Sequence, residues 1–458
     1  MAEIPLERTA VYAGPFDPPT KNHRGTARQL AGLYARVIIR PIGPLDGSAA
    51  EASLPIHRAV MVDLNFAGLD RVGVDLGELE RFPPPLRWER DENPDGPRTY
   101  VVSAALLKCG GGGRSTIQTE WSDGAEHWNR SHFTILKMPS EVIAAEDLPT
   151  RYVVLDVPEH QPSAAVRLQL VEGNSVDDLL EPRVADYIRR HGLFKATPPA
   201  RECRHRPTLP RMRLFFDEHS AAALEVSDEL QGYVHDDPEM IVSIGGDGTM
   251  LRAIRKHWRE RLPFYGINVG HLGFLLNDRG ERRFWERDLR LYQLPLLRVE
   301  TVNVEGERRA SLAFNDCWLE RSAGQTAWIE VDVNGETRMP KVVCDGMLIA
   351  TAAGSTSYAR AMRATPLPFN TPLLTLAGSN VLKPEFWQPA VLTLDSCVTL
   401  RNLDPAKRPL RGFVDGVEFG PVTEMTARVS QIAAVELLFT QEHDPVAKLA
   451  VLQFPRFT

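Results

Sequence analysis

Residues 240–249, MIVSIGGDGT, decide the fold of the second half of the chain, because an apolar strand runs directly into a glycine loop. Residues 240–244 predict a buried strand, and the apolar Met250, Leu251 and Ile254 follow at the spacing of a helix. Strand, loop and helix in this order predict a parallel α/β sheet. Glycines in such a loop let backbone N–H groups approach phosphate oxygens, and the start of the helix adds a favourable dipole.

An acid lies inside this glycine loop. Asp247 is a costly neighbour for phosphates unless it coordinates Mg²⁺ or accepts a proton from an attacking hydroxyl, and both are roles in phosphoryl transfer. A second strand and glycine loop follow closely, in residues 266–275, GINVGHLGFL. Loops at the ends of adjacent parallel strands line one crevice, which is where open α/β sheets bind ligands.

The first half of the chain has a similar opening. Residues 10–13 predict a strand, a Gly/Pro-rich turn follows, and a helix from about 23 to 35 leads into a second strand at 37–39. Further on, residues 152–155 predict a strand and residues 184–194 a closing helix. We therefore expect a parallel α/β sheet in this half as well.

Residues 195–210, KATPPARECRHRPTLP, are rich in Pro and Arg and separate the two halves. A strand is expected again at 214–216, and alternation over 328–333 followed by Asn334-Gly335 predicts a hairpin in a β-rich region. The expected organisation is a first domain over 1–197, a linker over 198–211, and a second domain over 212–458, α/β over about 212–297 and β-rich over about 298–458.

Composition is that of an ordinary globular enzyme. The formal net charge of −7 argues against nucleic acid as the main partner, but it leaves small anionic substrates open. The five cysteines form no C-x-x-C pair, which fits a reducing compartment. The beginning of the sequence lacks a signal-peptide pattern, and no apolar run is long enough to span a bilayer. We therefore expect a cytoplasmic protein without a membrane partner.

Ordered motifs in the second half resemble the NAD kinase family. GGDGTML and GINVGHLGFL are followed by Asn315-Asp316, by the segment 345–358, DGMLIATAAGSTSY, and by Asp415-Gly416, so the resemblance spans roughly 212–439. It implies that Asp247 acts on the 2′-hydroxyl of the adenosine ribose as general base or Mg²⁺-linked acid. It also implies a phosphate cradle for ATP and a site for the dinucleotide. The implied cradle residues are Gly245, Gly246, Gly248 and Thr249, and the implied dinucleotide residues are Asn315, Asp316, Asp345, Thr351, Ser355, Thr356 and Tyr358.

Part of the substrate shell departs from that family. Asp316 stands for the usual Glu, Ala352-Ala353 for Pro-Thr, and Ala364-Thr365 for Gly-Gly. A kinase acting on a non-standard dinucleotide is therefore an alternative to one acting on NAD. Lipid kinases also carry GGDGT, but the GTGND-type second loop of that class is absent here.

In the first half, residues 14–23, GPFDPPTKNH, follow the first strand and open the first helix. Thr20 and His23 lie at the helix start, where a hydrogen-bonding His can stabilise charge that builds on phosphorus. The frame resembles the T/H-x-x-H motif of nicotinamide or nicotinate mononucleotide adenylyltransferases, which implies a Rossmann-like nucleotidylyltransferase domain with Gly14 and Phe16 in its nucleotide-binding turn.

The end of this domain resembles the same family over SAAVR (163–167) and the stretch up to Phe194. The resemblance implies that Arg167 binds ATP phosphates and that Ser163 contributes a hydroxyl. Pro162 and Ala164 replace a Ser and a Thr of the family pattern.

Two hypotheses remain for the first half: an active adenylyltransferase, or a degenerate domain that binds nucleotide or mediates assembly. Retention of Thr20, His23 and Arg167 favours activity. The expected whole is a bifunctional homo-oligomer that uses ATP and Mg²⁺, joins a pyridine mononucleotide to AMP, and phosphorylates the resulting NAD to NADP.

Overall fold

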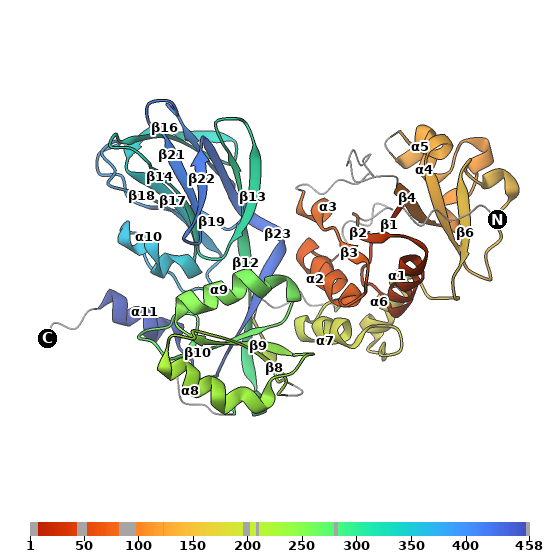
Figure 1. Cartoon of the computed structure of the whole chain (residues 1–458), viewed down its shortest axis with the longest axis horizontal. Helices are drawn as coiled ribbons and strands as arrows, with labels where there is room; N and C mark the ends of the chain where they lie inside the picture. Colours follow the sequence, from red (N-terminus) through yellow and green to blue (C-terminus); the bar gives the residue numbers. More distant parts are fainter. Residues whose placement is uncertain are drawn as a thin grey trace. The chain divides into compact units, whose positions relative to one another are not determined.

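The computed structural model describes residues 8–43, 53–81, 98–121, 123–195, 202–207, 210–278 and 283–454. The chain divides into two compact units, Met1–Ala200 and Arg201–Thr458. Each unit is described by itself below (Figure 1).

Unit 1 is built on a six-stranded sheet in the order β3-β2-β1-β4-β5-β6, in which every pair is parallel. This is the strand order of doubly wound α/β sheets, and the order reverses beside β1. The strands are β1 Thr9–Gly14, β2 Arg36–Pro41, β3 Val72–Val74, β4 Arg98–Ser103, β5 His132–Lys137 and β6 Tyr152–Asp156. The helices are α1 Lys21–Leu33, α2 Pro55–Phe66, α3 Gly77–Glu80, α4 Thr116–Glu120, α5 Gly124–Arg130, α6 Ser163–Glu172 and α7 Pro182–His191.

The α/β part of unit 2 is a parallel arrangement of β8 Met212–Phe216, β9 Met240–Gly245 and β10 Phe264–Asn268. Helix α9 (Asp247–His257) packs Met250 and Ile254 into the same cluster as Ile241. Helix α8 (Ala221–Leu230) packs with Val242 instead. Because neighbouring residues of a strand face opposite sides, the two helices cover opposite faces of the sheet.

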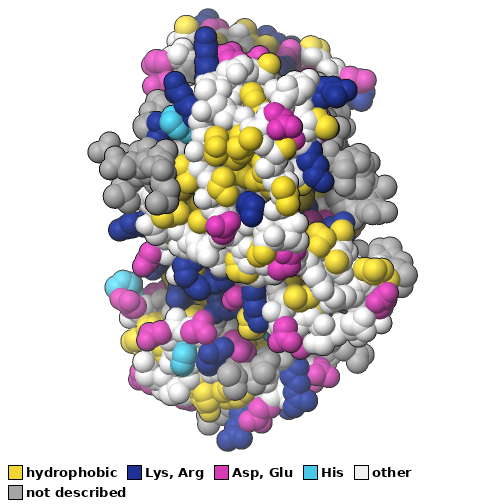
Figure 2. All heavy atoms as spheres, turned by 90° about the vertical axis from the view of Figure 1, so that its right-hand side faces the viewer, with side chains coloured by type: hydrophobic (Ala, Val, Ile, Leu, Met, Phe, Trp, Pro, Cys, Tyr) yellow, Lys and Arg dark blue, Asp and Glu magenta, His cyan; other side chains and the backbone are white. Residues whose placement is uncertain are grey.

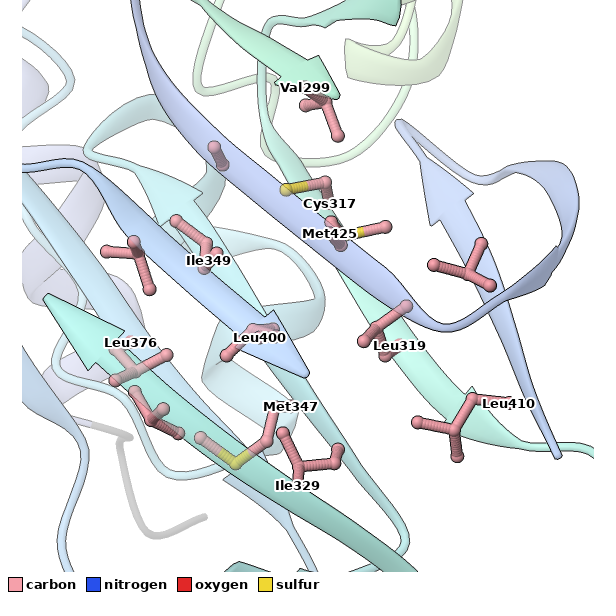
Figure 3. Packing of buried hydrophobic residues seen from close by; sticks show 14 of the residues in the cluster. Val299, Cys317, Leu319, Ile329, Met347, Ile349, Leu376, Leu400, Leu410 and Met425 are labelled. Carbon is pink, nitrogen blue, oxygen red and sulfur yellow. The ribbon is translucent and has the colours of Figure 1, made fainter. Parts of the chain in front are cut away.

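The β-rich part of unit 2 is a pair of sheets packed face to face around one apolar cluster (Figure 3). One is a six-stranded sheet in the order β19-β18-β17-β14-β21-β22, and the other continues the sheet of the α/β part through β16-β15-β20-β23. The strands of the first are β14 Asp316–Arg321, β17 Gly346–Thr351, β18 Leu373–Ser379, β19 Ala390–Thr393, β21 Leu410–Val414 and β22 Val417–Val422. The second sheet includes β13 Arg308–Ala313, β15 Ala327–Val333, β16 Glu336–Cys344 and β20 Val398–Asn402. The short helix of this region is α10 Tyr358–Ala361.

Two long strands join the parts of unit 2. Strand β23 (Glu424–Phe439) pairs with β10 near its end and with β20 near its beginning, while β12 (Leu289–Val302) runs antiparallel beside it. Strand β11 (Asn277–Asp278) follows the second glycine loop, and helix α11 (Pro445–Gln453) follows β23. The strands that precede the glycine loops and one sheet of the sandwich thus belong to one continuous sheet.

The predicted strands and helices quoted above are all present, with ends shifted by a few residues. Helix α7, for example, ends at His191 because Gly192 adopts a φ of +62°, which favours glycine. The prediction of a linker without secondary structure was wrong in one respect. Residues Glu202–His205 form strand β7, which pairs antiparallel with β12 and packs Cys203 against an apolar cluster. Partner strands supply its hydrogen bonds, so the segment itself carries no periodic pattern. Residues 198–201 and 208–209 of the predicted linker lie outside the described residues.

Within the described part of the chain, no helix is both long and apolar enough to cross a membrane. Acidic and basic side chains are interspersed over the face drawn in Figure 2, so that face does not carry a single sign of charge.

Truncating the centre of the sandwich tests this packing. Leu400 of β20 is fully buried in the apolar cluster, so Leu400→Ala should lower the free energy of unfolding by about 2 to 5 kcal/mol through lost burial and a residual cavity. Urea unfolding of the whole chain, followed by circular dichroism, measures the change. Val391→Ala, on the exposed side of β19, is the control and should change the value by no more than about 0.5 kcal/mol. Equal effects of the two substitutions would contradict this account of the core.

Candidate active sites in the two units

Asp247 is the first residue of α9, and its carboxylate is held by the second glycine loop. The backbone N–H of Phe274 donates to Oδ2 at 3.1 Å, and that of Leu275 donates to Oδ1 at 2.9 Å. Each carboxylate oxygen has a second acceptor position, so both remain able to meet a ligand. Parallel pairing of β9 with β10 brings the two loops together, and Val269 N–H donates to the Gly245 carbonyl at 3.0 Å.

The four cradle residues of the first loop divide into two pairs. Thr249 is buried, and a Cβ added at Gly245 would lie 2.4 Å from its Oγ1, so these two residues pack against each other. A Cβ added at Gly246 or Gly248 would meet nothing within 4 Å. Open space for a phosphate therefore lies beside Gly246 and Gly248, at the start of α9.

Asn315 and Asp316 are positioned by a carboxylate 100 residues further on. Asp415 accepts hydrogen bonds from the backbone N–H groups of Phe314, Asn315 and Asp316 at 2.7, 2.8 and 3.1 Å. Asp415 itself lies in the two-residue turn between β21 and β22, with positive φ at Asp415 and Gly416, as Asp-Gly hairpin turns require. The sequence resemblance includes this Asp-Gly but assigns Asp415 no role in the site.

Helix α9 reaches the same turn. Arg255 donates from Nη2 to the Asp415 carbonyl oxygen at 2.8 Å, which joins the helix that begins with Asp247 to the turn that orders Asn315 and Asp316. The two groups of predicted site residues therefore belong to one hydrogen-bonded frame within unit 2.

Burial, followed by the charge of Asp415, raises the pKa of Asp316 from 3.8 to about 7. Burial also raises the pKa of Asp415, although the three amides oppose that shift. Two buried carboxyl groups side by side disfavour ionisation of both, so the pair holds a proton that ordinary aspartates would lose. The side-chain oxygen of Asn315 is buried without a partner among the described residues and remains available as an acceptor.

The segment after β17 is folded around Thr351 and Ser355, both buried. Thr351 Oγ1 donates to the Phe314 carbonyl at 2.7 Å, and Ser355 Oγ donates to the Ala352 carbonyl at 2.6 Å. A Cβ at Gly354 would lie 2.2 Å from the Asn315 carbonyl oxygen, so only glycine fits there. Thr356 Oγ1 lies 3.4 Å from the carbonyl of Ala353. These hydroxyls shape the loop beside Asn315.

Asp345 and Tyr358 line a cleft of about 510 Å³ over β14 and β17. Asp345 accepts from Arg321 Nε at 2.6 Å and from Asn380 at 2.8 Å. Trp318, also in the cleft wall, stacks on Phe413 and meets Tyr358 edge to face. The residues that line this cleft include none from the two glycine loops.

In unit 1, Thr20 and His23 form a reciprocal cap at the start of α1. The Thr20 backbone N–H donates to His23 Nδ1 at 2.9 Å. Because a backbone N–H can only donate, Nδ1 carries no proton, and the neutral ring has its proton on Nε2. Burial, assisted by the nearby His160, lowers the pKa of His23 to about 4, which keeps this neutral donor at physiological pH.

The turn before α1 is packed tightly. Phe16 has a φ of 44° and is buried edge to face against His23, and a Cβ at Gly14 would contact its ring at 3.4 Å. Phe16 thus supports the turn and the His23 ring from the core side.

Ser163 and Arg167, far away in sequence, reach the same turn from α6. Ser163 Oγ donates to the Pro18 carbonyl at 2.9 Å, and Arg167 Nη1 donates to the Asp17 carbonyl at 2.6 Å. This turn follows β1, where the strand order of the sheet reverses and doubly wound folds bind ligands. The structure therefore gathers all the predicted site residues of unit 1.

Removing the carboxyl group of Asp316 should change how stability depends on pH. In the unfolded chain this group ionises near 3.8, whereas in the folded protein it stays protonated up to about 7. Between these values the unfolded state binds fewer protons, so the stability of the native protein falls as pH rises. Asp316→Asn lacks this loss. The free energy of unfolding of the variant minus that of the native protein should therefore increase from pH 4 to 7 and stay constant above pH 7. Urea titrations over this range measure the difference, with Glu305→Gln on an exposed turn as control. A difference that does not vary with pH would refute the assignment.

Comparison with known proteins identifies the family. The family model described as "ATP-NAD kinase N-terminal domain" matches residues 195–281. The NAD kinase of Rhizorhabdus wittichii is 35% identical over 250 residues, which cover 51% of this chain and 95% of that protein. The NAD kinase of Xylella fastidiosa is 35% identical over 223 residues, covering 48% and 85%. Yeast NADH kinase complexed with NADH aligns with a TM-score of 0.47 at 15% identity, covering 55% of this chain and 89% of that chain. The extent and identity of these sequence matches show that the chain belongs to the NAD kinase family.

Proposed function

We propose that unit 2 transfers the γ-phosphoryl group of ATP to the 2′-hydroxyl of the adenosine ribose of NAD, giving NADP and ADP. The observation that carries this proposal is the Asp247 carboxylate, fixed by two loop amides beside the open glycines Gly246 and Gly248. The two relatives compared above are themselves named NAD kinases.

The proposed step is an in-line displacement at the γ-phosphorus. The 2′-oxygen forms a bond to phosphorus as the bond to the β,γ-bridging oxygen breaks, and the hydroxyl proton passes to Asp247. Backbone N–H groups at the start of α9 and the helix dipole stabilise the phosphate charge. The loop amides bonded to Asp247 keep its carboxylate oriented toward the hydroxyl while leaving acceptor capacity on both oxygens.

ATP and Mg²⁺ are the proposed cofactors. Among the described residues no cluster of three or more His, Cys, Asp or Glu side chains is placed to hold a metal ion. Mg²⁺ commonly binds through substrate phosphates and one or two carboxylates, and Asp247 supplies one carboxylate at this site. When bound, the ion neutralises charge on the transferring phosphate.

The acceptor site is proposed to lie along Asn315, Asp316 and the loop Thr351–Tyr358. The unpaired Asn315 oxygen is a buried acceptor for an adenine amino group, and the protonated Asp316 is a donor or acceptor for a ribose oxygen. Ala352 and Ala353 leave fewer hydroxyls here than the family pattern. A non-standard dinucleotide is therefore the second candidate acceptor.

We further propose that unit 1 transfers the adenylyl group of ATP to nicotinamide or nicotinate mononucleotide. The mononucleotide phosphate attacks the α-phosphorus, and pyrophosphate leaves. Support comes from the turn at the end of β1, where the neutral His23, Ser163 and Arg167 meet. Arg167 supplies a permanent charge, and His23 supplies an N–H donor, for the phosphates. A domain that binds nucleotide or mediates assembly without turnover is the alternative. The cytoplasmic location and homo-oligomeric state expected from the sequence also stay predictions.

Substitution of the central acid tests the kinase. Asp247→Asn should lower kcat for NAD phosphorylation by about 100-fold, because the amide cannot accept the hydroxyl proton. Coupled assay of NADP formation measures kcat, and calorimetry should show ATP binding retained. Asp236→Asn, at an exposed position outside both glycine loops, should stay within about twofold of the native enzyme. Native turnover in Asp247→Asn would remove this residue from the chemistry.

The adenylyltransferase is tested with the kinase silenced. In full-length protein that carries Asp247→Asn, adding His23→Ala should reduce pyrophosphate release from ATP and mononucleotide by about 100-fold. The reason is that the substitution removes an N–H group that donates a hydrogen bond to the phosphates. The exposed His219→Ala serves as control. Pyrophosphate release no higher with His23 than without it would leave unit 1 as a binding or assembly domain.

A further inference from the structure

The C-terminal helix α11 contacts the second glycine loop through one lysine. Lys448 Nζ donates to the carbonyl oxygens of Gly273 at 2.9 Å and Leu276 at 2.8 Å, and it lies 3.0 Å from Asp278 Oδ1. An ammonium group has three N–H donors, and here each has one partner. The side chain is only 11% exposed, so these bonds form largely away from water and hold the loop firmly.

The same loop residues face Asp247 on their other side. The peptide group between Gly273 and Phe274 donates its N–H to Asp247 Oδ2, and its carbonyl accepts from Lys448. The two ends of a peptide dipole thus lie between a carboxylate and an ammonium ion. A rotation of this peptide would break both contacts at once. Lys448 therefore helps to hold the peptide in the orientation in which its N–H donates to Asp247, and Asp247 helps to hold the carbonyl toward Lys448.

From this geometry we propose that Lys448 is a positioning residue for the kinase reaction, which orients the Asp247 carboxylate through the Gly273–Phe274 peptide. The inference rests on the proposed phosphoryl transfer by unit 2. It assigns the C-terminal helix a role in turnover although the helix supplies no group to the substrate. Lysine suits this task because its compact ammonium group has three N–H donors, one for each of these acceptors.

Each partner of the Lys448 ammonium group complements it. Asp278 balances it, while the Gly273 and Leu276 carbonyl dipoles satisfy the remaining donors. His443 lies nearby, and its pKa is lowered to about 4 by burial and then by Lys448, so it adds no second charge near neutral pH. Gly273 itself has a φ of +60°, a conformation that an L side chain would strain.

The first experiment separates positioning from simple folding. Lys448→Met should lower kcat for NAD phosphorylation by about tenfold, with KM for ATP and NAD changed by no more than about twofold, because the loop shifts the carboxylate and not the bound substrates. Lys448→Arg, which keeps the charge, should recover part of the loss. Val451→Ala, exposed on the same helix, is the matched control and should match the native enzyme. If Lys448→Met does not fold, Lys448→Gln, which keeps one donor group, replaces it.

A double-mutant cycle shows whether Lys448 acts through Asp247. In the Asp247→Asn background, Lys448→Met should change the residual rate by no more than about twofold. A merely structural role would lower the rate by the same factor in both backgrounds, and that result would overturn the proposal.

Hydrogen exchange gives a readout that needs no activity. The amides of Phe274 and Leu275 should exchange faster in Lys448→Met than in the native protein or in Val451→Ala. Unchanged exchange would also overturn the positioning role. If the native protein fails to phosphorylate NAD, the proposed function fails, whereas this exchange measurement still reports whether Lys448 holds the loop.

Discussion

A carboxylate that accepts backbone N–H groups from a neighbouring loop is the interaction on which the kinase unit depends. Loops at strand ends have amides with no ladder partner, and leaving such groups unpaired in a half-buried place costs free energy. Asp247 satisfies two of them, so the second glycine loop takes one conformation and the acid takes one orientation. Parallel pairing of β9 with β10 makes this possible, because it places both loops at the same edge of the sheet.

The same device recurs at Asp415, whose carboxylate accepts three amides at the start of β14. Its consequence differs, because this acid lies beside a second buried carboxyl group, Asp316. The carboxylate that orders the backbone around Asn315 thus lies in a buried carboxyl pair in which ionisation of both groups is disfavoured. Arg255 joins the two devices by linking α9 to the Asp415 turn. Asp247 and Asp415 in unit 2 are therefore held by backbone contacts, which leave their side chains few free rotations.

In unit 1 a histidine, and not a carboxylate, accepts the backbone N–H that fixes its orientation. His23 accepts the Thr20 N–H and so caps its own helix, which fixes both the tautomer and the direction of the ring. Helix α6 then contributes Ser163 and Arg167 to the same turn by bonding to its carbonyls. Prolines in this turn have no backbone N–H to donate, and the two side chains supply donors to two of its carbonyl oxygens. The polar side chains that we propose for nucleotide binding are thereby gathered at the reversal point of the sheet.

The sequence by itself determined the strands that precede each glycine or proline turn, the parallel α/β class, the β-rich second part and the identity of the acids, since each follows from local periodicity or from a short motif. It also determined that Asp247 lies at a strand-to-helix loop. Only the tertiary structure decided that Thr249 packs inward over Gly245, that β7 pairs within the expected linker, that Asp415 orders Asn315, and that Lys448 clamps the loop around Gly273. These contacts join residues from 84 to 175 positions apart or depend on which way a side chain turns. No local pattern encodes either, because their free energy arises only when the sheet has brought the partners together.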